Sequence, residues 1–306
     1  MGPRATVVIP THDHGVILSR TIPTVQHQSV EDIEIFVVGD GVTEETRSVV
    51  ADLRAEDERI RFFDNPKAGL RGEPHRATAL REAAGRIVCY FSDDDLWVPD
   101  HVAILEGLLA KADFAHTYPC RIEPDGALVH WNVDLSVAWF RERMMAGENF
   151  FPFSSAGHTL ALYRQLPYGW RTPSPGGWHD LSMWQQILRV PEVRAVSGWT
   201  PTVAYFPSTL RPGWSWERRS TELDAWLERL RGGGWDTELQ RLLAQPVARD
   251  AARLQADLAS LQGRLERATR WTEELLAQIP AARRHEAEHE GAEEGPGFSR
   301  RPADGR

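Results

Sequence analysis

Acidic side chains follow three of the apolar runs that we expect to form strands in the first half of the chain. Asp13 comes shortly after the first run, Asp40 after the second, and Asp93, Asp94 and Asp95 directly after the fourth. Ligands of open α/β sheets bind beyond the carboxyl ends of the strands, where these acids are expected to meet. Carboxylates crowded there repel one another unless a divalent cation joins them, and such oxygen ligands suit Mg²⁺ or Mn²⁺. The sequence therefore indicates a metal–diphosphate site, with a solvated turn in which Asp95 caps a helix as the alternative.

Basic side chains would have to hold the phosphates together with the metal. The first strand is followed neither by a Walker-type loop nor by a GxGxxG run, which argues against a P-loop nucleotidase and a NAD dehydrogenase. Arg71 and Arg76, between the third and fourth strands, are candidates, and so is Arg211, in a loop that could close over a ligand. For Arg71 and Arg76, plain surface positions are the alternative.

The elements that position these residues alternate between strand and helix as far as residue 120. Short apolar runs rich in β-branched and aromatic residues predict strands at 6–9, 33–38, 61–63 and 87–91. Helices are expected at 16–28, at 73–84 and from Pro99 to Ala110. A further helix is expected to begin after Thr43, which would be its N-cap. This order indicates a doubly wound sheet.

The rest of the chain is patterned differently. Asp125-Gly126 between extended segments predicts a hairpin, and the Trp-, Pro- and Gly-rich stretch after it is expected to form a less regular half built against the same sheet. Apolar residues from Val247 to Ile279 step by four and three alternately, as in a heptad seam. That seam predicts a long helix that either pairs with a second copy, which we favour slightly, or docks on its own domain. The last 25 residues (282–306) are expected to be disordered.

Composition excludes several classes of protein. Two cysteines cannot build a disulfide scaffold or a zinc site of paired CxxC motifs, and they suit a reducing, cytoplasmic location. A net charge of −9 gives no basic footprint for nucleic acid. No apolar run reaches the roughly 20 residues that span a bilayer, so no transmembrane segment is expected.

Three segments together resemble the GT-A glycosyltransferases of family 2, and are similar to the spore-coat polysaccharide glycosyltransferase of bacilli. They are Val7 to Asp13, Val37 to Thr46, and Ala83 to Asp100, which contains the acidic motif followed by Leu-Trp-Val-Pro-Asp. The resemblance covers about residues 5 to 210. It implies an α/β GT-A, Rossmann-like fold with a mixed central sheet, here with the long C-terminal helix added. It also implies an inverting hexosyltransferase that uses Mn²⁺ or Mg²⁺ and a nucleotide-diphosphate sugar, with UDP favoured.

The resemblance also assigns residues on the donor side. Pro10, Thr11, Asp13, Asp40, Arg71, Arg76, Asp93 and Arg211 are expected to bind the nucleotide sugar, with Asp40 on the nucleotide base. The family's acidic motif is often Asp-x-Asp, with the first acid on the ribose and the last on the metal. Alignment through Leu96 and Pro99 gives Asp93 and Asp94 these roles, and a literal Asp-x-Asp alignment gives them to Asp93 and Asp95. We favour Asp94 on the metal, with Asp95 contributing or capping a helix.

The acceptor side follows from the same resemblance. A single displacement needs a base to take the acceptor's proton, and Asp180 matches the family's carboxylate, with His179 in place of the usual Glu. The alternative is that Asp180 only caps a helix. His158 is expected beside the metal, and Trp178, His179 and Trp214 as an acceptor or sugar wall.

We therefore divide the chain into a nucleotide-sugar and metal half (1–120), an acceptor half (121–243), a heptad helix (244–281) and a tail (282–306). The acceptor could be a carbohydrate, a metabolite or a peptide, and nucleic acid is not an expected partner. Gly39, Ser92 and His179 depart from the family pattern. They leave open a catalytically degenerate module that acts through its C-terminal helix. A nucleotidyltransferase is disfavoured because the loop after the first strand is neither Gly-rich nor basic.

Overall fold

The computed structural model describes residues 2–173, 179–231 and 235–278. The chain divides into two compact units, residues 1–247 and 248–306. What is described of the second unit is the continuation of one long helix, α9 (Trp235–Gln278). The predicted disordered tail (282–306) lies outside the described residues.

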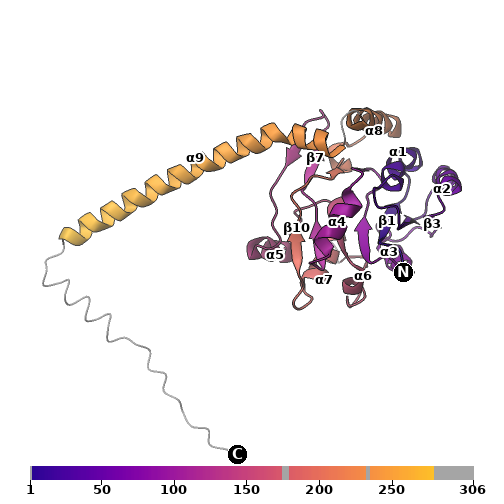
Figure 1. The fold of residues 1–306 in the computed structure, drawn as a ribbon, viewed down its shortest axis with the longest axis horizontal. Helices are drawn as coiled ribbons and strands as arrows, with labels where there is room; N and C mark the ends of the chain where they lie inside the picture. Colours follow the sequence, from indigo (N-terminus) through magenta and orange to yellow (C-terminus); the bar gives the residue numbers. More distant parts are fainter. Residues whose placement is uncertain (1, 174–178, 232–234, 279–306) are drawn as a thin grey trace, which may run out of the picture. The chain divides into compact units, whose positions relative to one another are not determined.

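A seven-stranded mixed sheet forms the centre of the first unit (Figure 1). Its strands are β1 (Ala5–Thr11), β2 (Ile33–Gly39), β3 (Ile60–Phe63), β4 (Ile87–Tyr90), β6 (Phe114–His116), β9 (Ala156–Thr159) and β10 (Ala195–Ser197). They lie in the order β10-β6-β9-β4-β1-β2-β3. The strands β1 to β4 pair in parallel, and β9 is antiparallel to β4 and β6. The predicted mixed sheet is thus confirmed.

Helices cover both faces of this sheet because successive strand residues point to opposite sides. Val7 and Ile9 of β1 pack on one face with α1 (Gly15–Gln26), α2 (Glu44–Glu56) and α4 (His101–Leu109). Val8 packs on the other face, in the cluster that holds α3 (Glu73–Leu80), α5 (Ala138–Met145), α6 (Leu160–Tyr163) and α7 (His179–Leu188). Both strand faces are therefore apolar, as the uninterrupted hydrophobic runs indicated.

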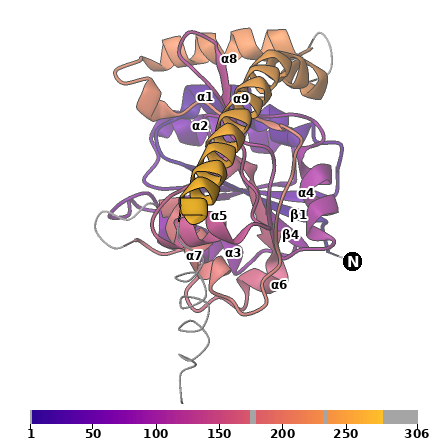
Figure 2. The same cartoon turned by 90° about the vertical axis from the view of Figure 1, so that its left-hand side faces the viewer.

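Smaller elements close the carboxyl edge of the sheet. The predicted hairpin is present as β7 (Cys120–Ile122) and β8 (Leu128–His130). Two further short strands, β5 (Leu96–Trp97) and β11 (Val203–Ala204), pair antiparallel. Helix α8 (Trp216–Arg231) packs on them through an apolar cluster that includes Phe206, Leu223 and Leu230. Figure 2 shows α8 running along α1, so that the first turns of α8 reach the end of the sheet where the acids were predicted.

Several predicted boundaries differ from the observed ones. Helix α3 ends at Leu80 rather than at residue 84, and α4 begins at His101 rather than at Pro99. The predicted cap at Thr43 is confirmed, since its hydroxyl accepts from Thr46 N at 3.3 Å. Helix α9 begins at Trp235, ahead of the predicted residue 244. None of the helices in the described ranges is both long enough and apolar enough to cross a membrane.

Candidate active site

The ends of three parallel strands meet at the edge where the acids were predicted. Thr11, the last residue of β1, pairs with Gly39 at the end of β2, and Asp40 N donates to Thr11 O at 2.9 Å. On the other side of β1, Phe91 N donates to Val8 O at 3.0 Å. Pro10, Thr11 and the residues after β2 and β4 therefore line one edge. The buried Thr11 Oγ1 has no hydrogen-bond partner, which leaves a polar group for a ligand to meet.

The acidic motif (Asp93–Asp95) is buried, and each of its carboxylates has defined partners. His14 Nδ1 lies 2.8 Å from Asp93 Oδ1. Asp94 Oδ1 accepts from Ser92 Oγ at 2.9 Å, and Asp94 Oδ2 accepts from Arg219 Nη2 of α8 at 3.0 Å. Two cations thus face the first two acids, and neither was assigned a role from the sequence.

Burial and mutual repulsion govern the protonation of this motif. Burial, together with the charge of Asp93, raises the pKa of Asp94, although Arg219 and His14 act to lower it. Burial by itself would lower the pKa of His14, but Asp93 and Asp94 raise it to about 9. His14 is therefore protonated at neutral pH, and the pair Asp93 and Asp94 is matched by two positive charges.

This donor set fits a hard divalent cation. Two adjacent carboxylates supply oxygen ligands. Burial and then the charge of Asp93 raise the pKa of Asp94, and a divalent cation would offset both effects. In the described part of the chain, no group of three or more His, Cys, Asp or Glu side chains could hold a metal ion. Asp93 and Asp94 would therefore share Mg²⁺ or Mn²⁺ with oxygens from a ligand and from water.

Asp95 has a structural role instead of the predicted metal contact. It is fully buried, its Oδ1 accepts from Phe206 N at 2.9 Å, and its Oδ2 accepts from Ser154 Oγ. These bonds fasten the acidic motif to η1 (Phe153–Ser155) and to the segment after β11. Because these buried bonds tie separate elements together, we favour the alignment that places Asp94 on the metal.

Asp40 lies where the nucleotide base was predicted, but it too has partners. Its Oδ1 accepts from Ala68 N at 2.6 Å, Lys67 Nζ contacts its Oδ2, and His75 Nε2 lies 3.6 Å from Oδ1. These contacts hold the 65–72 loop against the end of β2. A base that reached Asp40 would have to share it with Lys67. Asp13 is half-buried in the turn after β1.

A second charged cluster surrounds Asp180, the predicted base, at the start of α7. His179 contacts the fully buried carboxylate of Glu73, the first residue of α3, through Nδ1. The buried Arg76 lies over the ring of Trp170 at 4.4 Å, and its Nη2 donates to Arg71 O at 2.7 Å. Helices α3 and α7 thereby bring Arg71, Arg76, His179 and Asp180 together, although 100 residues separate them in the chain.

The electrostatics of this cluster suit a base. Burial raises the pKa of the Asp180 carboxyl, against the opposing positive charges of Arg76, His179 and Arg71. A carboxylate with a raised pKa binds a proton more readily and so accepts one from an acceptor hydroxyl more easily. The Nε of Arg76 is buried without a hydrogen-bond partner, so this guanidinium could still donate to a phosphate or sugar oxygen.

Tyr205 connects the two clusters, and sequence reasoning missed it. Burial raises the pKa of its phenol, and the negative charges of Asp95, Asp94 and Asp180 raise it further. The two clusters also meet through η1. Arg76 lies over the Phe153 ring at 5.7 Å, and the neighbouring Ser154 Oγ donates to Asp95 Oδ2.

The prediction that His158 contacts the metal is wrong. His158 is fully buried on β9, opposite Val88 of β4. Its Nε2 lies 2.6 Å from the Tyr90 hydroxyl and its Nδ1 lies 3.0 Å from Thr159 O, so both ring nitrogens are engaged. Burial lowers its pKa to about 4, and the neutral ring belongs to the aromatic core.

Arg211 does not reach into the site from a flexible loop as predicted. It is buried, donates through Nε to Glu222 Oε2 at 2.6 Å and through Nη2 to Ile122 O at 3.0 Å, and so ties α8 to the hairpin. Trp214, a predicted sugar wall, has the Arg218 guanidinium 3.6 Å from its ring centroid. Because the guanidinium covers one face of this ring, a sugar cannot stack on that face. Trp178, the other predicted wall residue, lies outside the described residues.

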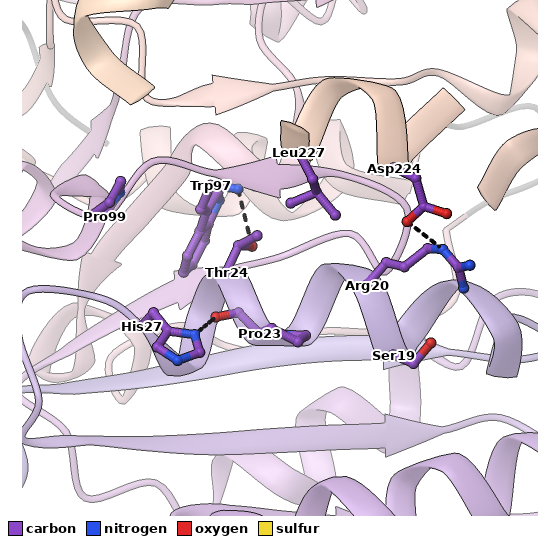
Figure 3. Close-up of a pocket in the computed structure, with 9 residues that line it drawn as sticks. All are labelled: Ser19, Arg20, Pro23, Thr24, His27, Trp97, Pro99, Asp224 and Leu227. Carbon is purple, nitrogen blue, oxygen red and sulfur yellow. Dashed lines mark hydrogen bonds and ion pairs between the residues drawn. The ribbon is translucent and has the colours of Figure 1, made fainter. Parts of the chain in front are cut away.

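A separate cavity of about 570 Å³ lies between α1, α8 and the start of α4 (Figure 3). It is lined by Ser19, Arg20, Pro23, Thr24, His27, Trp97, Pro99, Asp224 and Leu227. None of these residues belongs to the clusters around Asp94 or Asp180. The cavity is therefore distinct from the candidate active site.

A mixed α/β sheet with an acidic motif at its carboxyl edge is the arrangement of a GT-A glycosyltransferase. The model of the family described as "Glycosyl transferase family 2" matches residues 6–168, more than half of the chain. The chain belongs to glycosyl transferase family 2.

Known relatives agree with this assignment. The chain is 34% identical over 131 residues to the GalNAc(5)-diNAcBac-PP-undecaprenol beta-1,3-glucosyltransferase of Campylobacter jejuni. The matched segment covers 41% of each protein. It is 27% identical over 114 residues to the UDP-Glc:alpha-D-GlcNAc-diphosphoundecaprenol beta-1,3-glucosyltransferase WfgD of Escherichia coli, covering 37% of this chain and 44% of that one. The chain thus spans less than half the length of these relatives.

A solved structure shares the fold. The mannosyltransferase PcManGT of Pyrobaculum calidifontis, in complex with GDP-Man and Mn²⁺, superposes with a TM-score of 0.50 at 20% identity. The match covers 85% of this chain and 76% of that one. At this identity the likeness establishes the fold only.

Proposed function

We propose that this chain transfers a hexose from a nucleotide-diphosphate sugar, with UDP as the favoured nucleotide, to a carbohydrate acceptor, with inversion and with a divalent cation. The observation that carries the proposal is the meeting of two clusters at η1, where Ser154 contacts the acidic motif and Phe153 contacts Arg76 of the Asp180 cluster. A donor diphosphate at the acidic motif would place its sugar toward the base.

Asp93 and Asp94 would hold the cation, which when bound neutralises charge on the diphosphate leaving group. Arg71 and Arg76 donate to oxygens of the donor. The buried, unpartnered Nε of Arg76 supports this role. Asp40 and the polar end of β1 hold the nucleoside, with Lys67 fixing the loop against Asp40.

Asp180 acts as general base. It takes the proton of the acceptor hydroxyl while that oxygen attacks the anomeric carbon from the side opposite the diphosphate. Its raised pKa supports this role. His179 stays in contact with Glu73 at the start of α7, beside Asp180.

The relatives support the finer assignments. The Escherichia coli enzyme is named for UDP-glucose, an α-linked donor, and for a β-linked product, which is inversion. The names of both glucosyltransferases specify diphosphoundecaprenol-linked sugar acceptors. The structure that shares the fold holds Mn²⁺. These names support a carbohydrate acceptor and a divalent cation here.

A screen of UDP-, GDP- and dTDP-sugars tests the proposal. Thermal stabilisation and slow hydrolysis of one donor are expected with Mn²⁺, and both should be lost in EDTA. If no donor stabilised the protein in the presence of metal, or if EDTA had no effect, the proposed function would be overturned.

We also propose that α9 pairs with α9 of a second copy. Taken by itself, this helix exposes Leu254, Leu258, Leu261, Leu265 and Leu275, which are 42–69% accessible. Leucines at alternating steps of four and three form one stripe, and such a stripe is self-complementary in a coiled coil. A homodimer would cover it.

A further inference from the structure

Helix α8 delivers a buried arginine to the acidic motif. Arg219 is 3% exposed, and its Nη2 donates both to Asp94 Oδ2 at 3.0 Å and to Phe206 O at 3.2 Å. Asp94 is the carboxylate to which we assign the divalent cation. A guanidinium therefore occupies one oxygen of the expected metal ligand.

The guanidinium of Arg219 is only partly satisfied. Its Nε is buried without a hydrogen-bond partner, and it lies 3.9 Å from Glu222 Oε2. Glu222 is already engaged by both Nε and Nη2 of Arg211. Leaving a buried donor without an acceptor costs free energy, so an anionic oxygen that bound Nε of Arg219 would be stabilised there.

Other elements fix where this arginine can act. The ion pair between Arg211 and Glu222 joins α8 to the loop before it. Trp216, the first residue of α8, packs edge-on against His14, with 4.6 Å between the ring centroids. His14 in turn lies on Asp93. The first turns of α8 thus cover the acidic motif, and Arg219 is the charge that they place on it.

We infer that Arg219 is a diphosphate-binding residue that doubles as the resident cation of Asp94. Without donor it neutralises Asp94, and when a divalent cation takes Asp94 it donates to a phosphate oxygen of the donor instead. Guanidinium groups match phosphate oxygens in a bidentate manner, and Nε is one of the two donors needed. The inference rests on the proposed function, because it requires a diphosphate at this edge.

Two consequences separate this role from a structural ion pair. Arg219 and a cation compete for Asp94 in the absence of donor, so Arg219→Gln should bind Mn²⁺ alone several-fold more tightly than the wild type. The unpartnered Nε of Arg219 can also meet a diphosphate while Nη2 stays on Asp94, so Arg219 contributes to diphosphate binding without metal. The affinity for inorganic pyrophosphate in EDTA should therefore fall about tenfold in the same variant.

Arg20→Gln is the matched control. Arg20 Nε donates to Asp224 Oδ1 of α8 at 2.8 Å, so this change removes another arginine–carboxylate contact between α8 and the rest of the domain (Figure 3). It leaves the acidic motif untouched. Arg20→Gln should bind Mn²⁺ and pyrophosphate as the wild type does, and Arg219→Lys should keep part of the pyrophosphate affinity.

Free Mn²⁺ is measured by electron paramagnetic resonance and pyrophosphate binding by calorimetry, on the full chain. Tighter Mn²⁺ binding and weaker pyrophosphate binding in Arg219→Gln alone would support the inference. Unchanged or weaker Mn²⁺ binding, or a pyrophosphate affinity equal to that of the wild type, would overturn it. Asp94→Asn distinguishes the two proposals. If Asp94→Asn loses Mn²⁺ binding while Arg219→Gln behaves like Arg20→Gln, the proposed function stands and only this inference is overturned.

Discussion

Replacing His158 with glutamine should reduce the loss of unfolding free energy that acidification causes, and it should leave metal binding intact. The ring is buried and neutral, with a pKa of about 4 against an ordinary value of 6.5. Between these two values the unfolded chain binds a proton that the folded chain does not. Acidification therefore favours unfolding, and the stability is fully present only above about pH 6.5.

The magnitude follows from the two pKa values. Between pH 7 and pH 5 the linkage relation gives a loss of about 2 kcal/mol in the free energy of unfolding for His158. The buried His116, with a pKa of about 4, and His101, with a pKa of about 3, each add a similar loss. His14 acts in the opposite sense. Its pKa of about 9 gives stability that is present below pH 6.5 and lost toward pH 9, which offsets a smaller part of the loss.

Urea unfolding followed by tryptophan fluorescence at pH 7 and pH 5 measures the effect. In His158→Gln the difference in unfolding free energy between the two pH values should be about 2 kcal/mol smaller than in the wild type. Glutamine can still meet the Tyr90 hydroxyl, so the variant should fold. His27→Gln, which changes an exposed histidine, should leave the difference unaltered. An unchanged pH difference in His158→Gln, or a loss of Mn²⁺-dependent donor binding, would refute the assignment of His158 to the core.

Three further changes test the site and the helix. Asp94→Asn should abolish Mn²⁺-dependent donor binding with an unchanged circular dichroism spectrum, and wild-type affinity in a titration would contradict the metal assignment. Asp180→Asn should lower kcat by about 10²-fold with donor affinity unchanged, and a parallel loss of affinity would make Asp180 a binding residue. Truncation after Gln245 should turn a dimer into a monomer that still hydrolyses donor, because no assigned residue lies beyond it. Light scattering that gives a monomeric mass for the full chain would rule out the dimer.

The sheet could be predicted from the sequence because its signals are local. Each strand of the first half is a short, mostly apolar run with Gly, Pro or Asp at its end or within a few residues of it, and Thr43 marks a helix start by its own side chain. The end of α3 could not be predicted in this way. Gly85 looks like a helix cap, but its backbone abuts β1, where a Cβ would lie 2.3 Å from Thr6 N. Tertiary contact rather than helix termination explains that glycine.

The acids of the site were predictable because each follows a strand, whereas most of their partners were not. His158 precedes an apolar run, and only the antiparallel register of β9 shows that its ring points to Tyr90 and not to the strand ends. Glu73 and His179 lie 106 positions apart, and no spacing rule connects them. Tyr205 similarly carries no motif.

The arginines show most clearly where sequence reasoning stops. Arg211 stands in a Pro-Gly loop, which favoured a mobile phosphate-binding role, yet it is committed to Glu222 and Ile122 O. Arg219 lies near the start of a charged helix and is 125 positions from Asp94, so its pattern matches that of an exposed residue. The two differ in one physical respect. Every described nitrogen of Arg211 has an acceptor, whereas Arg219 is buried with Nε lacking one. A buried donor without a partner beside the acidic motif arises from packing and cannot be recognised in the sequence. Because of it, we expect the phosphate contact from Arg219 in α8 and not from Arg211 in the loop.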